Sequence, residues 1–277
     1  MDKDFLVEQY VNLGKSMADI ARENHCSRQT VYRLIKKYGI PPRNRSESRK
    51  KALEAGKFKD KERRHINETF FEHSNWSPAM AWVLGLLFAD GNLKKNKPEF
   101  RLSQRNKEGL QKVLNLMSSS HKIAVKEKKS YKGVISGKIY SFEVWNKKLY
   151  NDLLNLGLIP AKSTEMKFPE VPPKYMNHFI RGLYDGDGSF YINRFDGAII
   201  SQYRNGSLDF ITAVTDILQK ELNIPITIHR NEKFNTYYIK IRQKIKELAA
   251  YLYKGASEAV YLTEKYDNIR NLLEQQQ

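Results

Sequence analysis

The sequence predicts an α+β protein built from two similar halves, with a small all-α domain in front of them. An apolar segment that ends in Asp-Gly occurs twice, at 82–91 and 179–188. Each copy is followed by alternating apolar stretches and a helix-like run in the same order, which indicates strands and helices mixed within each half. The closing carboxylates, Asp90 and Asp187, lie 97 residues apart, about the length of one small domain. Such a repeat indicates two copies of one fold whose acidic ends meet.

The first forty residues predict a pair of helices joined by a short break. Ser16 is a candidate N-cap with Asp19 three residues later, and a second helix-like run covers 27–38. The pattern resembles a helix-turn-helix of the resolvase or transposase-like kind, which implies that 1–40 is a DNA-binding domain with the start of its second helix in the major groove. A small helical bundle without DNA contacts is the alternative. The expected DNA contacts in this domain are Arg28, Gln29, Thr30 and Arg33.

The segment 41–75 is expected to be a basic linker. Residues 41–65 hold ten Lys or Arg against four Asp or Glu. The segment has little apolar periodicity, so it buries little surface on its own. It is either a solvated connection or an arm that follows DNA phosphates between the two domains.

The ends of the two repeated segments are unusual for helices. A carboxylate at a helix C-terminus faces the negative end of the helix dipole, and two such carboxylates brought together repel each other. A divalent cation removes both penalties, and Mg²⁺ is typically held by one or two carboxylates with phosphate oxygens. Gly85 and Gly182, five residues before the acids, would let two helices pack closely. Gly91 and Gly188 suit a helix end with left-handed backbone. The alternative is two ordinary core helices that end in Asp-Gly turns.

Both segments resemble the motifs of the LAGLIDADG homing endonucleases, with Val-Leu-Gly-Leu-Leu-Phe-Ala-Asp-Gly at 83–91 and Ile-Arg-Gly-Leu-Tyr-Asp-Gly-Asp-Gly at 180–188. The resemblance implies a pseudo-symmetric pair of αββαββα halves, at 76–168 and 169–277. Their motif helices would meet and their sheets would form a saddle over DNA. It also implies that the last acid of each motif binds Mg²⁺, with two or more divalent ions in all. The expected metal site consists of Asp90, Asp187, Gly91 and Gly188.

The surroundings of the two motifs repeat as well. The first motif departs from the family pattern with Phe88, whereas the second keeps an earlier acid, Asp185. Ser-Gln pairs end at Gln104 and Gln202, 14 and 15 residues after the closing acids. In the family a polar side chain near the metals helps to position water, although either Gln alone could be a solvent-facing strand residue. The resemblance also implies one basic catalytic residue in each half, and the candidates are Lys162 and Lys265.

The composition favours a polyanionic partner. The net charge is +17 with 48 Lys and Arg, and the pI is near 9.7. Lys and Arg contacts to phosphates supply most non-specific DNA affinity, although RNA-binding and membrane-surface proteins are basic too. Cys26 is the single cysteine, which excludes an intramolecular disulfide. The sequence has no 18-residue apolar run and no secretory or transit pattern at its start, so we expect a cytoplasmic, nucleoid-associated protein, with an organelle left open. The DNA contacts expected in the two sheets are Arg101, Lys126, Lys128, Arg194, Arg230 and Lys240.

Together these features predict a site-specific, Mg²⁺-dependent endonuclease that cuts both strands of DNA and leaves short 3′ overhangs. A monomer with two unlike halves would read a long asymmetric target. Two alternatives keep the same fold: an intron RNA maturase and a non-cleaving transcription regulator. A nuclease domain inside an intein is a third, but the chain begins with Met and shows no splicing nucleophile, so a free-standing protein is expected.

Overall fold

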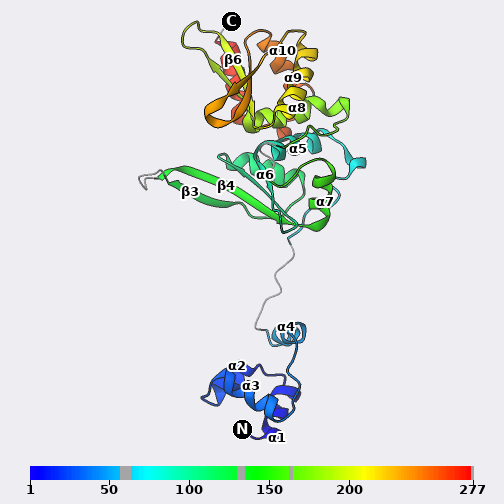
Figure 1. Ribbon diagram of the computed structural model, residues 1–277, viewed down its shortest axis with the longest axis vertical. Coiled ribbons are helices and arrows are strands. Elements are labelled where there is room, and N and C mark those ends of the chain that lie inside the picture. Colours follow the sequence, from blue (N-terminus) through cyan, green and yellow to red (C-terminus); the bar gives the residue numbers. More distant parts are fainter. Residues whose placement is uncertain (57–63, 130–134, 162–164, 276–277) are drawn as a thin grey trace. The chain divides into compact units, whose positions relative to one another are not determined.

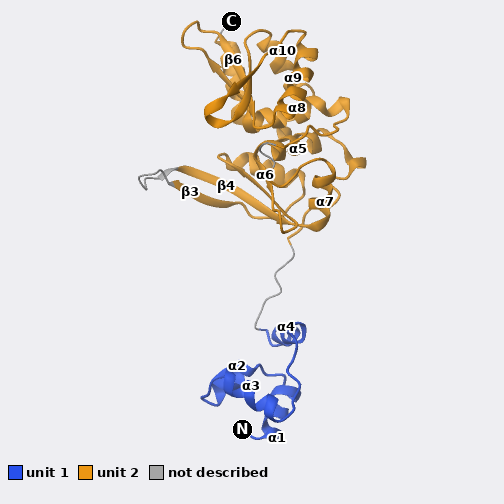
Figure 2. Cartoon of the chain, in the orientation of Figure 1, with its two compact units in different colours: residues 1–63 blue, residues 64–277 orange. Residues whose placement is uncertain are grey.

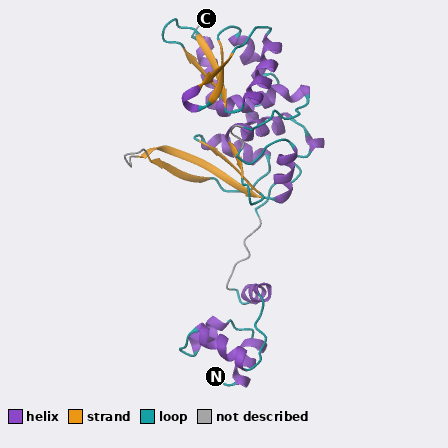
Figure 3. Cartoon of the chain, viewed as in Figure 1, coloured by secondary structure: helices purple, strands orange, loops and turns teal. Residues whose placement is uncertain are grey.

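The computed structural model describes residues 1–56, 64–129, 135–161 and 165–275. The chain divides into two compact units, Met1–Arg63 and Arg64–Gln277 (Figure 2). The described part of the first unit is helical, whereas the second combines helices and strands (Figure 3). The division between the units falls inside the segment 41–75, where the sequence predicts a linker.

The first unit packs short helices around a small apolar core. Leu6, Ile20, Val31 and Ile35 are fully buried there. The predicted cap at Ser16 is present, because its hydroxyl accepts from Asp19 N and the Asp19 carboxylate accepts from Ser16 N. The helices of this unit are α1 (Lys3–Leu6), a π-helical turn (Val7–Asn12), α2 (Met17–Glu23), α3 (Arg28–Lys37) and α4 (Arg45–Glu54) (Figure 1).

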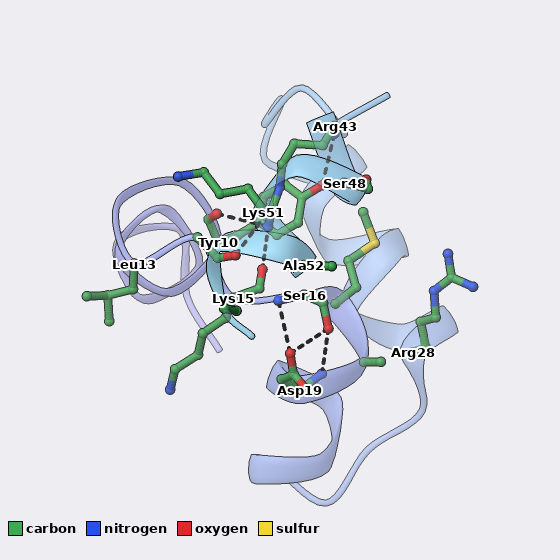
Figure 4. Close-up of a pocket in the computed structure, with 14 residues that line it drawn as sticks. Tyr10, Leu13, Lys15, Ser16, Asp19, Arg28, Arg43, Ser48, Lys51 and Ala52 are labelled. Carbon is green, nitrogen blue, oxygen red and sulfur yellow. Dashed lines mark hydrogen bonds between the residues drawn. The ribbon is translucent and has the colours of Figure 1, made fainter. Parts of the chain in front are cut away.

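Helix α4 lies within the segment that the sequence predicts to be a linker. It begins with a capping box between Asn44 and Glu47 and buries none of its residues. Arg43, just before it, donates to the backbone carbonyls of Tyr10 and Gly14, and its guanidinium lies 4.1 Å from the centroid of the Tyr10 ring. Figure 4 shows these contacts beside a surface pocket between α2 and α4. Arg43 therefore fastens the start of α4 to the helices before it.

The second unit repeats one order of elements, helix–strand–strand–helix–strand–strand–helix. The first copy consists of α5 (Pro78–Asp90), β1 (Gly91–Leu93), β2 (Glu99–Gln104), α6 (Lys107–Leu116), β3 (Ala124–Lys129), β4 (Ile135–Trp145) and α7 (Lys147–Asn155). The second consists of α8 (Met176–Asp187), β5 (Ser189–Ile192), β6 (Ile199–Asn205), α9 (Leu208–Leu222), β7 (Ile228–Asn231), β8 (Thr236–Ile241) and α10 (Ile245–Tyr253), followed by α11 (Thr263–Glu274). Short 3-10 turns lie at His73–Asn75, Pro173–Tyr175, Glu232–Phe234 and Glu258–Val260.

Within the described residues, each half forms a four-stranded antiparallel sheet. The strand orders are β1-β2-β4-β3 and β5-β6-β8-β7, so the two sheets have the same topology. The predicted α+β class and the pair of similar halves are confirmed. Among the described helices, none has the length and apolar character that crossing a bilayer requires.

The motif helices α5 and α8 pack directly against each other (Figure 1). A Cβ added at Gly85 would lie 2.3 Å from Phe179 O, and one added at Gly182 would lie 2.3 Å from Trp82 O. Only glycine fits at this crossing, as the sequence predicts. The contact brings the C-terminal ends of both helices together and so positions the two closing acids.

Helix α8 carries a buried polar stripe that α5 lacks. His178, Arg181 and Asp185 are all at most 5% exposed. Arg181 donates from Nη2 to His178 Nδ1 at 2.7 Å, from Nη1 to Leu252 O at 2.7 Å and from Nε to Val260 O at 2.8 Å. The guanidinium thus ties α8 to the last turn of α10 and to the segment between α10 and α11.

His178 is expected to make the protein less stable in acid. Burial, and then the charge of Arg181, lowers the pKa of His178 to about 4 from 6.5. Between these pH values the unfolded chain binds a proton that the native protein does not. The free energy of unfolding is therefore unaffected by His178 above pH 6.5 and decreases as the pH drops toward 4. The loss amounts to at most about 3 kcal/mol. Chemical denaturation of His178→Gln, which keeps an acceptor for Arg181, should show a shallower acid dependence. Identical pH profiles would contradict the assignment.

Candidate metal and nucleic-acid site

Asp90 and Asp187 are the last residues of α5 and α8, where the motif helices end side by side. Gly91 and Gly188 follow with extended backbone, at φ −80° and −84°, so the predicted left-handed helix ends are wrong. Glycine is required for a different reason. A Cβ at Gly91 would lie 2.4 Å from Leu87 O, and one at Gly188 would lie 2.6 Å from Tyr184 Cδ1. The chain turns sharply from helix into strand and leaves no room for a side chain.

A cavity of about 520 Å³ opens beside Asp90. Gln104 lies at the end of β2, and its Nε2 is 3.4 Å from Asp90 Oδ2. The other amide atom, Gln104 Oε1, is buried and has no hydrogen-bond partner among the described residues. The structure thus brings Asp90 and Gln104 together, with the amide nitrogen of Gln104 toward the carboxylate. The cavity is also lined by Ser103, Arg105, Asn106, Gly186, Leu262, Glu264 and Lys265.

Lys265 reaches this cavity from the other half. It lies on α11, and its Nζ donates to Gly188 O at 2.6 Å. The sequence predicts Lys265 as the basic residue of the half that contains Asp187. Its ammonium bonds Gly188 in that half, and the residue also lines the cavity of Asp90. The C-terminal helix of the second half thus reaches the cavity of the first. The corresponding candidate in the first half, Lys162, lies outside the described residues.

A second cavity, of about 280 Å³, opens beside Asp187. Its lining includes Asn205, whereas Gln202 is not part of it. Gln202 lies in β6 opposite Ser189 and Lys240, and its Oε1 accepts from Tyr191 Oη at 3.3 Å.

Gln104 and Gln202 lie at similar distances in sequence from Asp90 and Asp187, but the strand registers show that they do not occupy equivalent positions in the two sheets. Gly91 pairs with Leu102 and Ser189 with Gln202, so Arg101 is the counterpart of Gln202 and Asn205 is the counterpart of Gln104. Both Gln104 and Asn205 lie two residues before the N-cap of the following helix. The hairpin after Asp187 is four residues longer than the hairpin after Asp90, so an equal number of residues after the acid reaches a different position in the second strand. The predicted equivalence of Gln104 and Gln202 is therefore wrong, and strand register would have been needed to find Asn205.

Two buried ionisable side chains lie near the ends of the motif helices, Asp185 in α8 and Tyr203 in β6. Burial raises the pKa of Asp185 to about 7, while hydrogen bonds from Trp82 and the Leu262 amide lower it. Burial, and then the negative charge of Asp187, raises the pKa of Tyr203 well above its usual value. The closing acids themselves are more accessible, since Asp90 is half-buried and Asp187 is exposed, so a cation could reach both carboxylates from solvent.

The chemistry of the donor set fits Mg²⁺. Among the described residues, no three His, Cys, Asp or Glu cluster as a closed metal site. Mg²⁺ does not need such a cluster, because it usually keeps waters and binds one or two carboxylates with substrate phosphates. Asp90 and Asp187 would supply the carboxylates.

The predicted DNA contacts of the second sheet lie on two different faces. Successive strand residues face opposite sides of a sheet, and directly paired residues share a side. Lys240 pairs with Gln202, and Arg204, two residues along, pairs with Tyr238 on the same face. Arg230 pairs with Tyr237 and so lies on the opposite face.

The face that carries Lys240 also holds residues that the sequence analysis missed. His229 stacks on Tyr238 at a centroid distance of 5.2 Å, and Lys240 Nζ lies 5.6 Å from the centroid of the Tyr238 ring. Alternation from Lys240 would have identified Tyr238. Of the other expected contacts, Arg101 forms an ion pair with Glu143. The remaining ones are exposed: Arg28, Gln29, Thr30, Arg33, Lys126, Lys128 and Arg194.

Comparison with known proteins supports the fold. Residues 174–274 match the family model of the LAGLIDADG-like domain. The structure of the homing endonuclease I-WcaI bound to its DNA recognition sequence is similar, with a TM-score of 0.53 and 12% identity over 71% of this chain and 89% of that one. No curated protein gives a significant sequence match.

Two further solved structures are similar at lower scores. Full-length DUF199/WhiA from Thermatoga maritima has a TM-score of 0.47 and 16% identity, over 76% of this chain and 65% of that chain. Mesophilic variants of the homing endonuclease I-DmoI have a TM-score of 0.45 and 18% identity, over 74% and 99%.

Proposed function

We propose that this protein is a site-specific endonuclease that cuts both strands of DNA with Mg²⁺. The observation that carries the proposal is the pair of carboxylates, Asp90 and Asp187, at helix ends that glycines bring together. Each carboxylate borders its own cavity, as a double-strand cut with two scissile phosphates requires. The net charge of +17 suits a polyanionic substrate.

The residues around the cavities have separate roles in this proposal. Asp90 and Asp187 would hold the metal ions, with oxygens of the DNA completing the coordination. Bound Mg²⁺ polarises a phosphate and lowers the pKa of a water molecule. Gln104, within 3.4 Å of Asp90, orients water at the first cavity, and the ammonium of Lys265 offsets negative charge that develops on the phosphate. Asn205 takes the place of Gln104 at the second cavity.

DNA would lie against the sheet faces, with phosphates contacted by Lys and Arg and bases read in the major groove. In the second sheet this face presents Arg204, Tyr238 and Lys240. The chain would act as a monomer on a long asymmetric site, because its two halves differ in sequence. A cytoplasmic protein bound to the nucleoid fits this activity.

The proposal is tested by exposing a randomised duplex library to the protein with Mg²⁺ or with Ca²⁺. The expected result is sequence-selective double-strand cleavage with short 3′ overhangs in Mg²⁺, and binding without cleavage in Ca²⁺. Tight, selective binding without cutting in any divalent metal would overturn the nuclease and favour a regulator or an RNA maturase.

We also propose that the first unit is a helix-turn-helix that adds specificity. The exposed residues at the start of α3 would contact bases there. Arg33→Ala is expected to weaken specific binding about tenfold or more, because one good base contact is worth roughly 1–3 kcal/mol. The measurement is a competition titration of specific against random DNA. Arg22→Ala, which removes an exposed Arg from α2, is the matched control. Equal losses for both variants on both DNAs would contradict a reading role for α3.

A further inference from the structure

Helix α8 contacts the C-terminal segment through a polar face, and the equivalent positions of α5 are apolar. The polar stripe of α8 consists of His178, Arg181 and Asp185. The residues 97 positions earlier in α5 are Ala81, Leu84 and Phe88, all apolar and at most 1% exposed. The pseudo-symmetric contact is also replaced: Phe88 packs edge-on against Phe179, whereas Trp82 Nε1 donates to Asp185 Oδ2 at 2.7 Å. The polar arrangement is thus built into one half.

Asp185 holds the start of α11. Its Oδ2 accepts from the backbone amide of Leu262 at 3.0 Å. Leu262 is the N-cap residue of α11, and Asp185 accepts from its backbone amide as the N3 side chain does in a capping box, but from another helix. A carboxylate at this position also faces the positive end of the α11 dipole. One oxygen therefore joins α5, α8 and α11 through two hydrogen bonds.

The same turn of α11 carries Lys265, three residues after Leu262. Its Nζ donates to Gly188 O, and its side chain lines the cavity of Asp90. Asp185 is among the residues that line that cavity as well. The position of the ammonium therefore depends on where α11 begins, and Asp185 fixes that point.

We propose that Asp185 is a positioning residue, which places Lys265 in the cavity of Asp90 by holding the first turn of α11. The proposal rests on the proposed function, in which Lys265 acts on DNA. The counterpart at Phe88 packs through apolar contacts, so this device serves the first cavity and leaves the second to different interactions. Loss of Asp185 should therefore slow one of the two strand cuts more than the other.

Two substitutions separate the hydrogen bonds from bulk packing. Asp185→Asn keeps an oxygen that accepts from Trp82 and Leu262, whereas Asp185→Leu fills the space without an acceptor. Cleavage of a supercoiled plasmid with the selected site is measured at saturating and limiting DNA. Asp185→Leu is expected to lower the single-turnover rate about tenfold to a hundredfold, to leave the DNA affinity unchanged and to accumulate nicked plasmid. Asp185→Asn should retain most of the rate.

A double-mutant cycle with Lys265→Ala shows whether Asp185 acts through Lys265. If it does, Asp185→Leu should have little further effect once Lys265 has been removed. Independent, multiplying effects of the two changes would overturn the proposal. So would equal loss of rate in Asp185→Asn and Asp185→Leu, or no loss in either.

A second readout requires no cleavage. Hydrogen exchange of the full-length protein is expected to show the Leu262 amide exchanging at least tenfold faster in Asp185→Leu than in Asp185→Asn. The indole N–H resonance of Trp82 should shift in Asp185→Leu as well. Phe88→Leu, at the pseudo-equivalent position, is the control and should leave the Leu262 amide unchanged. Unchanged exchange in Asp185→Leu overturns the positioning role even if DNA is cut. If the wild-type protein cuts no DNA but the Leu262 amide still exchanges faster in Asp185→Leu, the proposed nuclease function fails. The role of Asp185 in holding the start of α11 would then still stand.

Discussion

Asp187→Asn is expected to abolish DNA cleavage while the protein still binds its site. The substitution keeps the size of the side chain at the end of α8 but removes the charge that would hold Mg²⁺. One preorganised donor in an active site is already worth a factor of roughly 10²–10³, so losing a metal-holding carboxylate should cost about a thousandfold or more. The measurement is the single-turnover rate in Mg²⁺, combined with the dissociation constant in Ca²⁺.

A matched control separates this effect from a change in net charge. Asp196→Asn also removes one negative charge, but it does so at an exposed hairpin residue that pairs with Arg242. This variant should cut DNA at the wild-type rate or slightly faster, because its surface becomes more positive. If Asp187→Asn cuts within tenfold of the wild type, the carboxylate does not hold the catalytic metal, and the proposed mechanism fails.

The repeated motif was predictable because its requirements are local. Close helix packing needs glycine at Gly85 and Gly182, and the sharp exit from each helix needs another directly after the acid. Both requirements fix the spacing of the two glycines and the acid within each motif, and this spacing is visible in the sequence alone. The capping box of Ser16 and Asp19 was visible for the same reason, since its partners are three residues apart.

Other parts of the site depend on geometry that sequence spacing does not contain. Asn205 replaces Gln202 because two hairpins of different length precede equivalent strands, so equal offsets from the acids reach unequal positions. The placement of Lys265 involves contacts between distant segments: Arg181 donates to Leu252 O and Val260 O, and Asp185 accepts from the Leu262 amide. Helix α4 has no buried residues and hence no apolar period, although its capping box at Asn44 was a usable signal.

Gly182→Ala is expected to destabilise the second unit strongly, about as much as Gly85→Ala at the same helix crossing. The added Cβ would lie 2.3 Å from Trp82 O, 2.9 Å from Gly85 Cα and 2.9 Å from Leu86 N. All three neighbours are backbone atoms of α5, so the helices must move apart as rigid bodies. Overpacking of this kind costs about 3 kcal/mol, which corresponds to a fall in Tm of roughly 10 °C for a unit of this size.

Thermal unfolding of the full-length protein measures this effect, with Gly255→Ala as the control. Gly255 has φ +64° and nothing within 4 Å of its added Cβ, so that variant reports backbone strain alone, about 1 kcal/mol. Separation of α5 and α8 would also separate the carboxylates at their ends, so Gly182→Ala should lose cleavage at temperatures where it remains folded. Equal melting temperatures for the two variants would mean that the motif helices cross at a greater distance, and the shared carboxylate site would then lose its structural basis.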